Sequence, residues 1–121
     1  MRIGTLGLVL PLVVGFATGG FAAAVSANGA HLRALDKISG VAYDIDLKRG
    51  ETVAFKQLTI SLHDCRYPSE DPTSNAYASL TIQDDVQRLR LFDGWMIADS
   101  PALSALDHHR YDVWVVRCDT P

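Results

Sequence analysis

Short runs in which every second residue is apolar recur along the chain, and this pattern restricts the fold more than any other feature of the sequence. Residues 41–47 alternate Val, Tyr, Ile and Leu with Ala and Asp. Residues 58–63 and 78–83 alternate Leu, Ile or Ala with polar residues. A period of two is typical of strands that bury one face and expose the other. The pattern therefore predicts half-buried β-strands.

Three other segments carry strands of a different kind. Residues 32–38 mix apolar and charged residues without a clear period, which predicts a weak strand that runs into a turn at Ser39 and Gly40. Residues 88–98 become apolar on both faces, and Gly94 within them predicts a bulge or a close backbone approach. Residues 111–118 are rich in β-branched and aromatic residues, which favour a last strand.

These strands together predict an all-β fold. Six or seven short strands within about 94 residues are typical of a small antiparallel barrel or sandwich. One short helix is expected after Ser100, a favourable N-cap residue, with Pro101 at the first helical position. We expect a single domain over residues 28–121.

The first 27 residues have the composition of a signal peptide. Arg2 supplies a positive charge, an apolar run covers residues 3–21, and small residues follow at 22–27. This order is typical of an exported protein whose leader is removed, after Ala27 or after Ala24. The alternative is a leader that is retained as a membrane anchor, since the run is close to the length of about 20 residues that spans a bilayer.

Cys65 and Cys118 are the two cysteines of the chain. In an oxidising compartment two cysteines have one possible pairing. A bridge would close a loop of about 54 residues and contribute on the order of 4 kcal/mol to the free energy of unfolding. The alternative is two free thiols in a reducing compartment.

The balance of charge argues against a nucleic-acid partner. Without Arg2, ten basic residues oppose fourteen acidic ones, and the basic residues do not cluster. Binding to phosphates needs a basic surface. We therefore expect an acidic domain that binds neither nucleic acid nor a cofactor.

His108 and His109, next to Asp107, form the most suggestive group of chemically active side chains. They are weak candidates for a metal site, because adjacent residues at a helix end point about 100° apart. The favoured interpretation is a pair of imidazoles at the C-terminus of the short helix. An enzyme would most plausibly be a metal-assisted hydrolase that uses these residues or His63, whereas a cysteine or serine hydrolase lacks the required free thiol or motif.

Aromatic residues are the remaining candidates for function. Trp95, Tyr67, Trp114 and His108 form the candidate contact surface, because large aromatic side chains that stay exposed mark binding sites. The loop expected over residues 66–75, with two prolines, is a second candidate for binding. A small-ligand binder would need a pocket beside one of the tryptophans.

The sequence resembles the alphaproteobacterial DUF2155 family. The resemblance is carried by Gly94-Trp95-Met96, by the segment Ser100 to His108, and by Tyr111-Asp112-Val113-Trp114, and it extends from Leu35-Asp36-Lys37 to Cys118. His109 departs from the family, which tends to have a proline there.

The resemblance implies a small exported envelope protein with no assigned catalytic residues. Members of the family are often encoded beside a small accessory subunit of respiratory complex I. This implies a protein partner in the cell envelope such as a respiratory membrane complex. The sequence as a whole therefore favours a non-enzymatic periplasmic accessory or binding module.

Overall fold

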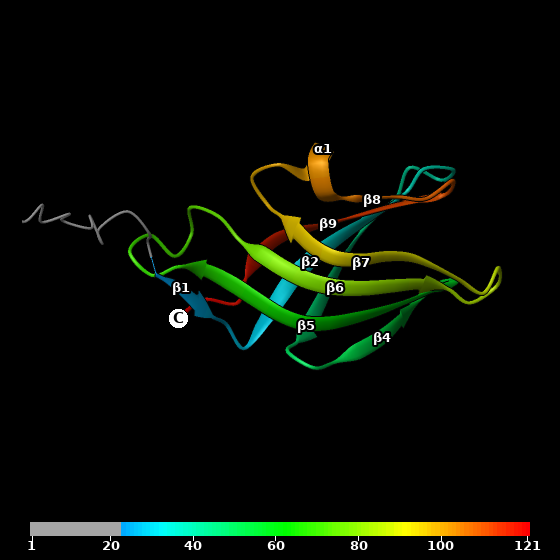
Figure 1. The fold of residues 1–121 in the computed structure, drawn as a ribbon. Coiled ribbons are helices and arrows are strands. Elements are labelled where there is room, and N and C mark those ends of the chain that lie inside the picture. The colour runs from blue at the N-terminus through cyan, green and yellow to red at the C-terminus, as the bar shows by residue number, and fades with distance from the viewer. Residues whose placement is uncertain (1–22) are drawn as a thin grey trace, which may run out of the picture.

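The computed structural model describes residues 23–121, which form two antiparallel β-sheets packed face to face (Figure 1). The elements in chain order are β1 (Ala24–Ser26), β2 (Gly29–Asp36), β3 (Ala42–Lys48), β4 (Thr52–Phe55), β5 (Leu58–Pro68), β6 (Tyr77–Asp84), β7 (Leu89–Ile97), α1 (Pro101–Ser104), β8 (Leu106–Asp107) and β9 (Tyr111–Cys118). The predicted all-β class is confirmed. The sheets do not close on each other, so the fold is a sandwich and not a barrel.

The two sheets differ in how their strands are joined. The larger sheet has the order β1-β5-β6-β7, and β4 pairs with the first half of β5. The smaller sheet has the order β3-β2-β9-β8. The chain thus crosses between sheets after β1, after β3 and after β7. β2 and β9, far apart in sequence, lie side by side in the smaller sheet.

The core lies between the sheets and follows the alternation seen in the sequence. The larger sheet contributes inward side chains that are fully buried, including Leu58, Ile60, Leu62, Leu80, Ile82 and Met96. The smaller sheet faces them with Leu32, Val113 and Val115. Because every second side chain points inward, the polar residues between them are left on the two outer faces.

Cys65 and Cys118 connect the sheets. Their sulfur atoms lie 2.13 Å apart, and both residues are buried. Cys65 is on β5 and Cys118 ends β9, so the bond joins one sheet to the other. The pairing expected from the sequence is thus present at disulfide distance.

Several expectations need correction. The strand expected to be weak over residues 32–38 is β2 over residues 29–36, and it is a central strand, because β2 pairs with β3 on one side and β9 on the other. The loop predicted to begin at residue 66 begins after Pro68, so Tyr67 belongs to β5. The helix does follow Ser100 and begins at Pro101, but it ends at Ser104. His108 and His109 therefore lie in the turn between β8 and β9, and not at a helix C-terminus.

Most of the predicted leader lies outside the described residues. Its last residues are part of the larger sheet, where Ala24–Ser26 pair with Arg66–Pro68. Ala27 is buried, and its backbone N–H donates to the Cys65 carbonyl oxygen at 2.7 Å. Among residues 23–121, no helix is long and apolar enough to cross a membrane.

Candidate functional site

Trp95 lies on the outer face of the larger sheet. Its side chain is 46% exposed, and the Arg66 guanidinium lies over the indole ring, 5.6 Å from the ring centroid. In the register of the strands, Ser79 lies between Trp95 and Asp64. A guanidinium over an aromatic face is favourable. The contact holds in place a large aromatic side chain that lies outside the hydrophobic core.

Arg66 is itself held in place by a carboxylate. Its Nε donates to Asp64 Oδ2 at 2.8 Å, and the Ser26 hydroxyl donates to the same oxygen at 3.3 Å. Burial alone would raise the pKa of Asp64, but the hydrogen bonds from Arg66 and Ser26 outweigh it and lower that pKa. The second oxygen, Oδ1, is buried and has no hydrogen-bond partner among residues 23–121. The side chains of β1, β5 and β7 are thus linked around Trp95.

A chain of polar side chains continues along the same face. His63 Nε2 lies 2.7 Å from the Thr81 hydroxyl, which donates to Asp93 Oδ1 at 3.2 Å. Since the Thr81 proton goes to Asp93, His63 is the donor in the first contact. Arg90 donates to the other oxygen of Asp93 at 3.3 Å. His63 therefore donates a hydrogen bond to the Thr81 hydroxyl and is not positioned to accept the proton of that hydroxyl.

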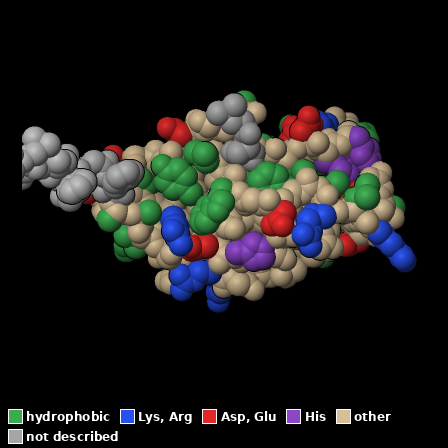
Figure 2. Space-filling view, in the orientation of Figure 1, with side chains coloured by type: hydrophobic (Ala, Val, Ile, Leu, Met, Phe, Trp, Pro, Cys, Tyr) green, Lys and Arg blue, Asp and Glu red, His purple; other side chains and the backbone are tan. Residues whose placement is uncertain are grey.

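The cluster around Trp95 and the polar residues around Thr81 make the outer face of the larger sheet a mixed aromatic and polar surface. Figure 2 shows hydrophobic side chains beside Lys or Arg side chains, with a histidine and carboxylates further along the sheet. The face is exposed and gathers hydrogen-bond donors and acceptors around one aromatic ring. Such a composition resembles that of protein-binding surfaces, in which Trp and Arg are enriched.

His63 and Cys65 do not form a nucleophile with its base. They lie two residues apart at a bulge in β5, with His63 exposed and Cys65 buried. Cys65 is bonded to Cys118 and has no free thiolate. The geometry therefore gives no support to a cysteine hydrolase.

His108 is buried and is not part of an exposed surface, which corrects its place in the candidate contact surface. Its Nε2 lies 2.9 Å from Asp84 Oδ2, and its Nδ1 accepts a hydrogen bond from the Arg110 backbone N–H at 3.1 Å. Both ring nitrogens are therefore used, with the proton on Nε2. His108 therefore has a structural role through these two hydrogen bonds and is shielded from solvent.

The other weak metal candidates are engaged elsewhere. The Asp107 carboxylate lies 2.9 Å from Lys37 Nζ, a contact that lowers the pKa of Asp107 and raises that of Lys37. His109 is exposed and contacts the His108 ring at a tilt of 38°, with ring centroids 3.9 Å apart. Residues 23–121 contain no group of three or more His, Cys, Asp or Glu side chains that could hold a metal ion.

The remaining two aromatic candidates lie apart from each other. Tyr67 is 8% exposed and belongs to the core, so it too leaves the candidate contact surface. Trp114 is half-buried on β9 and borders a surface pocket of about 330 Å³ next to α1. The pocket is lined by Pro101, Ala102, Ala105, Leu106, Asp107, Asp112 and Trp114. Trp95 and Trp114 thus mark two separate places.

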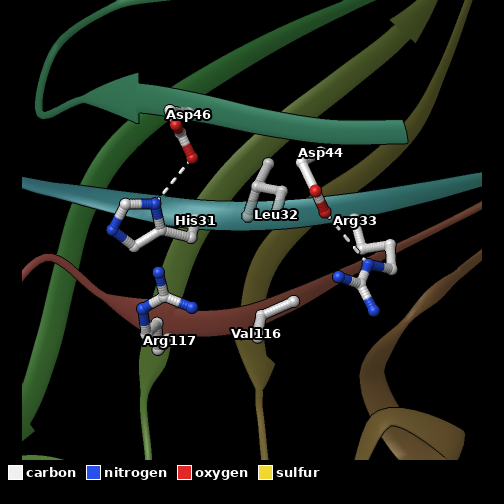
Figure 3. A pocket seen from close by; sticks show the side chains of 7 residues that line it. All are labelled: His31, Leu32, Arg33, Asp44, Asp46, Val116 and Arg117. Atoms are coloured by element: carbon white, nitrogen blue, oxygen red, sulfur yellow. Dashed lines mark hydrogen bonds and ion pairs between the residues drawn. The ribbon is translucent and has the colours of Figure 1, made fainter. Parts of the chain in front are cut away.

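A second pocket lies on the outer face of the smaller sheet (Figure 3). It has a volume of about 200 Å³, and pairs of opposite charge cross it from β3 to β2. His31 Nδ1 lies 2.6 Å from Asp46 Oδ1, and Arg33 Nε donates to Asp44 Oδ1 at 3.0 Å. Among the Lys and Arg side chains that line the pocket, Arg33 is paired with Asp44, and Arg117 has no ion-pair partner in the described part of the chain.

Sequence reasoning assigned Arg66 to a candidate binding loop but missed its contact with Trp95, and it missed the role of Asp64 and the charged ladder on β2 and β3. A signal for Arg66 was present, because it follows a buried cysteine in an alternating strand and so must face outward. Its position over Trp95 depends on the register between β5, β6 and β7. That register is set by contacts across the whole sheet and cannot be read from one segment.

Comparison with known proteins identifies relatives without a known activity. The model of a family described as an uncharacterized protein conserved in bacteria, DUF2155, matches residues 30–118. An uncharacterized protein of Rickettsia prowazekii (strain Madrid E) is 33% identical over 88 residues, which cover 70% of this chain and 57% of that protein. This chain therefore spans little more than half the length of that relative. No solved structure matches.

Proposed function

The chain belongs to the DUF2155 family, and from this premise we propose that it is an exported, non-enzymatic accessory module that binds a protein partner in the cell envelope. Trp95 is the observation that carries the proposal, because its half-exposed ring is held by Arg66 on an exposed face of the larger sheet. Exposed, ordered tryptophans that contact arginine are typical of the residues that dominate binding energy at interfaces.

Export is supported by two features that are independent of each other. The first is the apolar leader that ends in small residues. The second is the buried Cys65–Cys118 pair, since disulfides persist in oxidising compartments such as the periplasm. Of the two cleavage positions, removal after Ala24 leaves Val25, Ser26 and the buried Ala27 in the mature protein, whereas removal after Ala27 takes away β1.

The partner we propose is a membrane complex of the envelope, and a respiratory complex is the candidate that the family resemblance supplies. The sandwich offers a rigid body with one ordered aromatic face, which suits docking on a larger assembly. The Arg66–Asn75 region borders the same face, because Arg66 contacts Trp95 and the loop after Pro68 follows directly.

Site-specific crosslinking in intact cells tests this proposal. A photoreactive residue is placed at Ser79, which lies opposite Trp95 in the register, and the matched control carries it at Asp44 on the outer face of the other sheet. We expect a discrete crosslinked product from position 79 that mass spectrometry identifies as an envelope protein. The product is expected to disappear in the Trp95→Ala variant.

Two results would contradict the proposal. One is the same set of products from positions 79 and 44, because binding would then not depend on the Trp95 face. The other is recovery of the protein in the cytoplasmic fraction with free thiols. Elemental analysis of the purified protein in parallel tests the metal-assisted hydrolase, which requires a bound ion.

A small-ligand binder is a second candidate because a pocket of about 330 Å³ borders Trp114. This volume lies at the lower end of the range of about 300–1,000 Å³ that is usual for ligand sites. Titration with an apolar fluorescent probe is expected to quench Trp114 if the pocket is used. Quenching that persists in the Trp114→Phe variant would place the probe elsewhere.

A further inference from the structure

Exposed aliphatic side chains gather at one end of the sandwich. Of the seven large hydrophobic residues that are exposed within residues 23–121, four lie on or beside two hairpin turns. Ile38 and Val86 are each 73% exposed, Leu89 is 53% exposed and Val41 is 46% exposed. Figure 1 shows the β2–β3 and β6–β7 turns at the same end of the molecule, opposite to the C-terminus. Turn residues are usually polar. A group of exposed aliphatic side chains on turns is therefore a candidate interaction site.

The two turns are held in place by buried groups. Asp84 Oδ1 accepts hydrogen bonds from the backbone N–H groups of Val86 and Gln87, and its Oδ2 pairs with His108. In the β2–β3 turn, the backbone N–H of Lys37 donates to the Arg110 carbonyl oxygen at 2.8 Å. His108 and Arg110 belong to one turn, which therefore links the other two.

Cations without an ion-pair partner accompany the aliphatic side chains. Arg88 is exposed between Val86 and Leu89 and makes no ion pair with any described residue. Lys56, in the turn between β4 and β5 at the same end, lies over the Tyr43 ring and likewise has no carboxylate partner in this part of the chain. Of the carboxylates nearby, Asp36 and Asp84 are buried and Asp107 is paired with Lys37. Asp85 accepts a hydrogen bond from Thr59 and remains exposed.

We propose that this hairpin-tip surface, formed by Ile38, Val41, Val86, Leu89, Arg88 and Lys56, docks on a lipid bilayer with anionic headgroups. Aliphatic side chains on projecting turns can insert into the apolar part of a lipid bilayer. Arginine and lysine beside them are placed for headgroup phosphates, which attract such cations near a membrane surface. Docking at this end orients the module and leaves the Trp95 face free.

Sedimentation of the purified protein with vesicles tests the proposal. The vesicles contain phosphatidylethanolamine with phosphatidylglycerol, and vesicles of phosphatidylcholine alone serve as the neutral comparison. We expect binding to the anionic vesicles that weakens as salt is added. The double variant Ile38→Ser/Val86→Ser is expected to bind at least tenfold more weakly, and Arg88→Gln several-fold more weakly.

Val116→Ser is the matched control. Val116 is an exposed aliphatic residue on the outer face of the smaller sheet, away from the turns. Its replacement is expected to leave vesicle binding unchanged. All four replaced positions are exposed, so unchanged melting temperatures are expected and are measured for each variant.

Either of two results would overturn the proposal. The first is the absence of binding to anionic vesicles by the unmodified protein, and the second is equal binding by the unmodified protein and the Ile38→Ser/Val86→Ser variant. Neither result bears on the protein partner proposed for the Trp95 face, because the vesicles contain no protein.

Discussion

His108 donates a hydrogen bond from Nε2 to Oδ2 of Asp84 across the two sheets, at 2.9 Å, and both side chains are almost completely buried. Asp84 ends β6 in the larger sheet, and His108 follows β8 in the smaller one. Burial alone would raise the pKa of Asp84, but the hydrogen bonds from Gln87, His108, Gln57 and Val86 outweigh it and hold that pKa far below its usual value. The contact ties the sheets at the hairpin end, as Cys65–Cys118 ties them nearer the termini.

Removal of the imidazole at position 108 is expected to destabilise the protein. In His108→Ala, one oxygen of a buried carboxylate loses a hydrogen-bond donor, and a cost of about 1–3 kcal/mol in the free energy of unfolding follows. Urea denaturation measures it. His109→Ala is the control, because His109 is exposed and contributes a tilted ring contact with His108. Equal loss in the two variants would show that His108 acts through this ring contact and not through Asp84.

Acid is expected to weaken the fold through Asp36. The Arg110 guanidinium donates to Asp36 Oδ2 at 3.2 Å and, with backbone donors at Ile38 and Ser39, lowers the pKa of Asp36 from 3.8 to about 2. The unfolded chain therefore binds this proton at a higher pH than the folded protein does. The stability that the group provides is complete above the unfolded pKa and is lost as the pH falls through about 4 towards 2.

The Asp36→Asn variant tests that pH dependence. Its urea midpoint is expected to fall less steeply than that of the unmodified protein between pH about 5 and about 2. Asp99→Asn is the control, because Asp99 is exposed. Parallel curves for the unmodified protein and Asp36→Asn would mean that other carboxylates govern the acid transition.

Much of the fold could be predicted from local sequence because alternation reports directly on burial. The strands at 42–48 and 77–84 and the first part of β5, up to Cys65, were all visible in this way, whereas residues 66–68 were assigned to a loop. The strand at 29–36 was underestimated because its inward residues are mostly small: Ala30, Leu32 and Ala34 face the core, whereas Leu35 is on the other face. Alanine carries little hydrophobic signal in a sequence, although Ala30 and Ala34 are completely buried here.

Features that depend on contacts between segments could not be predicted. Gly94 was expected to mark a bulge or a close backbone approach, but it pairs regularly with Leu80, and the atoms nearest to a Cβ placed there belong to the Phe92 side chain at 3.9 Å. The irregularity occurs at Leu91 instead, where Ile82 pairs with Phe92 and the next residue pairs with Arg90. The burial of His108 likewise depends on Asp84, which is 24 residues away. Sequence patterns report on local burial, and they contain no information on such partners.

The Cys65–Cys118 bond is expected to supply a large share of the stability. The cysteines are 53 positions apart, and closing a loop of this length stabilises a protein by about 4 kcal/mol. The Cys65→Ala/Cys118→Ala variant is therefore expected to unfold at a much lower urea concentration. Treatment of the unmodified protein with a reductant should give a similar shift. A variant as stable as the oxidised protein would show that packing alone holds the sheets together.

Gly29 is expected to tolerate no side chain, unlike Gly94. A Cβ at position 29 would lie 2.3 Å from the Leu47 carbonyl oxygen, a backbone atom of β3 that cannot move without breaking the pairing of β2 with β3. At position 94 the nearest atoms are 3.9 Å away and belong to the Phe92 ring, which is ordinary van der Waals contact. Gly29→Ala should therefore cost about 1–3 kcal/mol in the free energy of unfolding, whereas Gly94→Ala should cost little. Urea denaturation of both variants measures the difference, and a Gly29→Ala variant of unchanged stability would mean that β2 and β3 are further apart at this end than the structure places them.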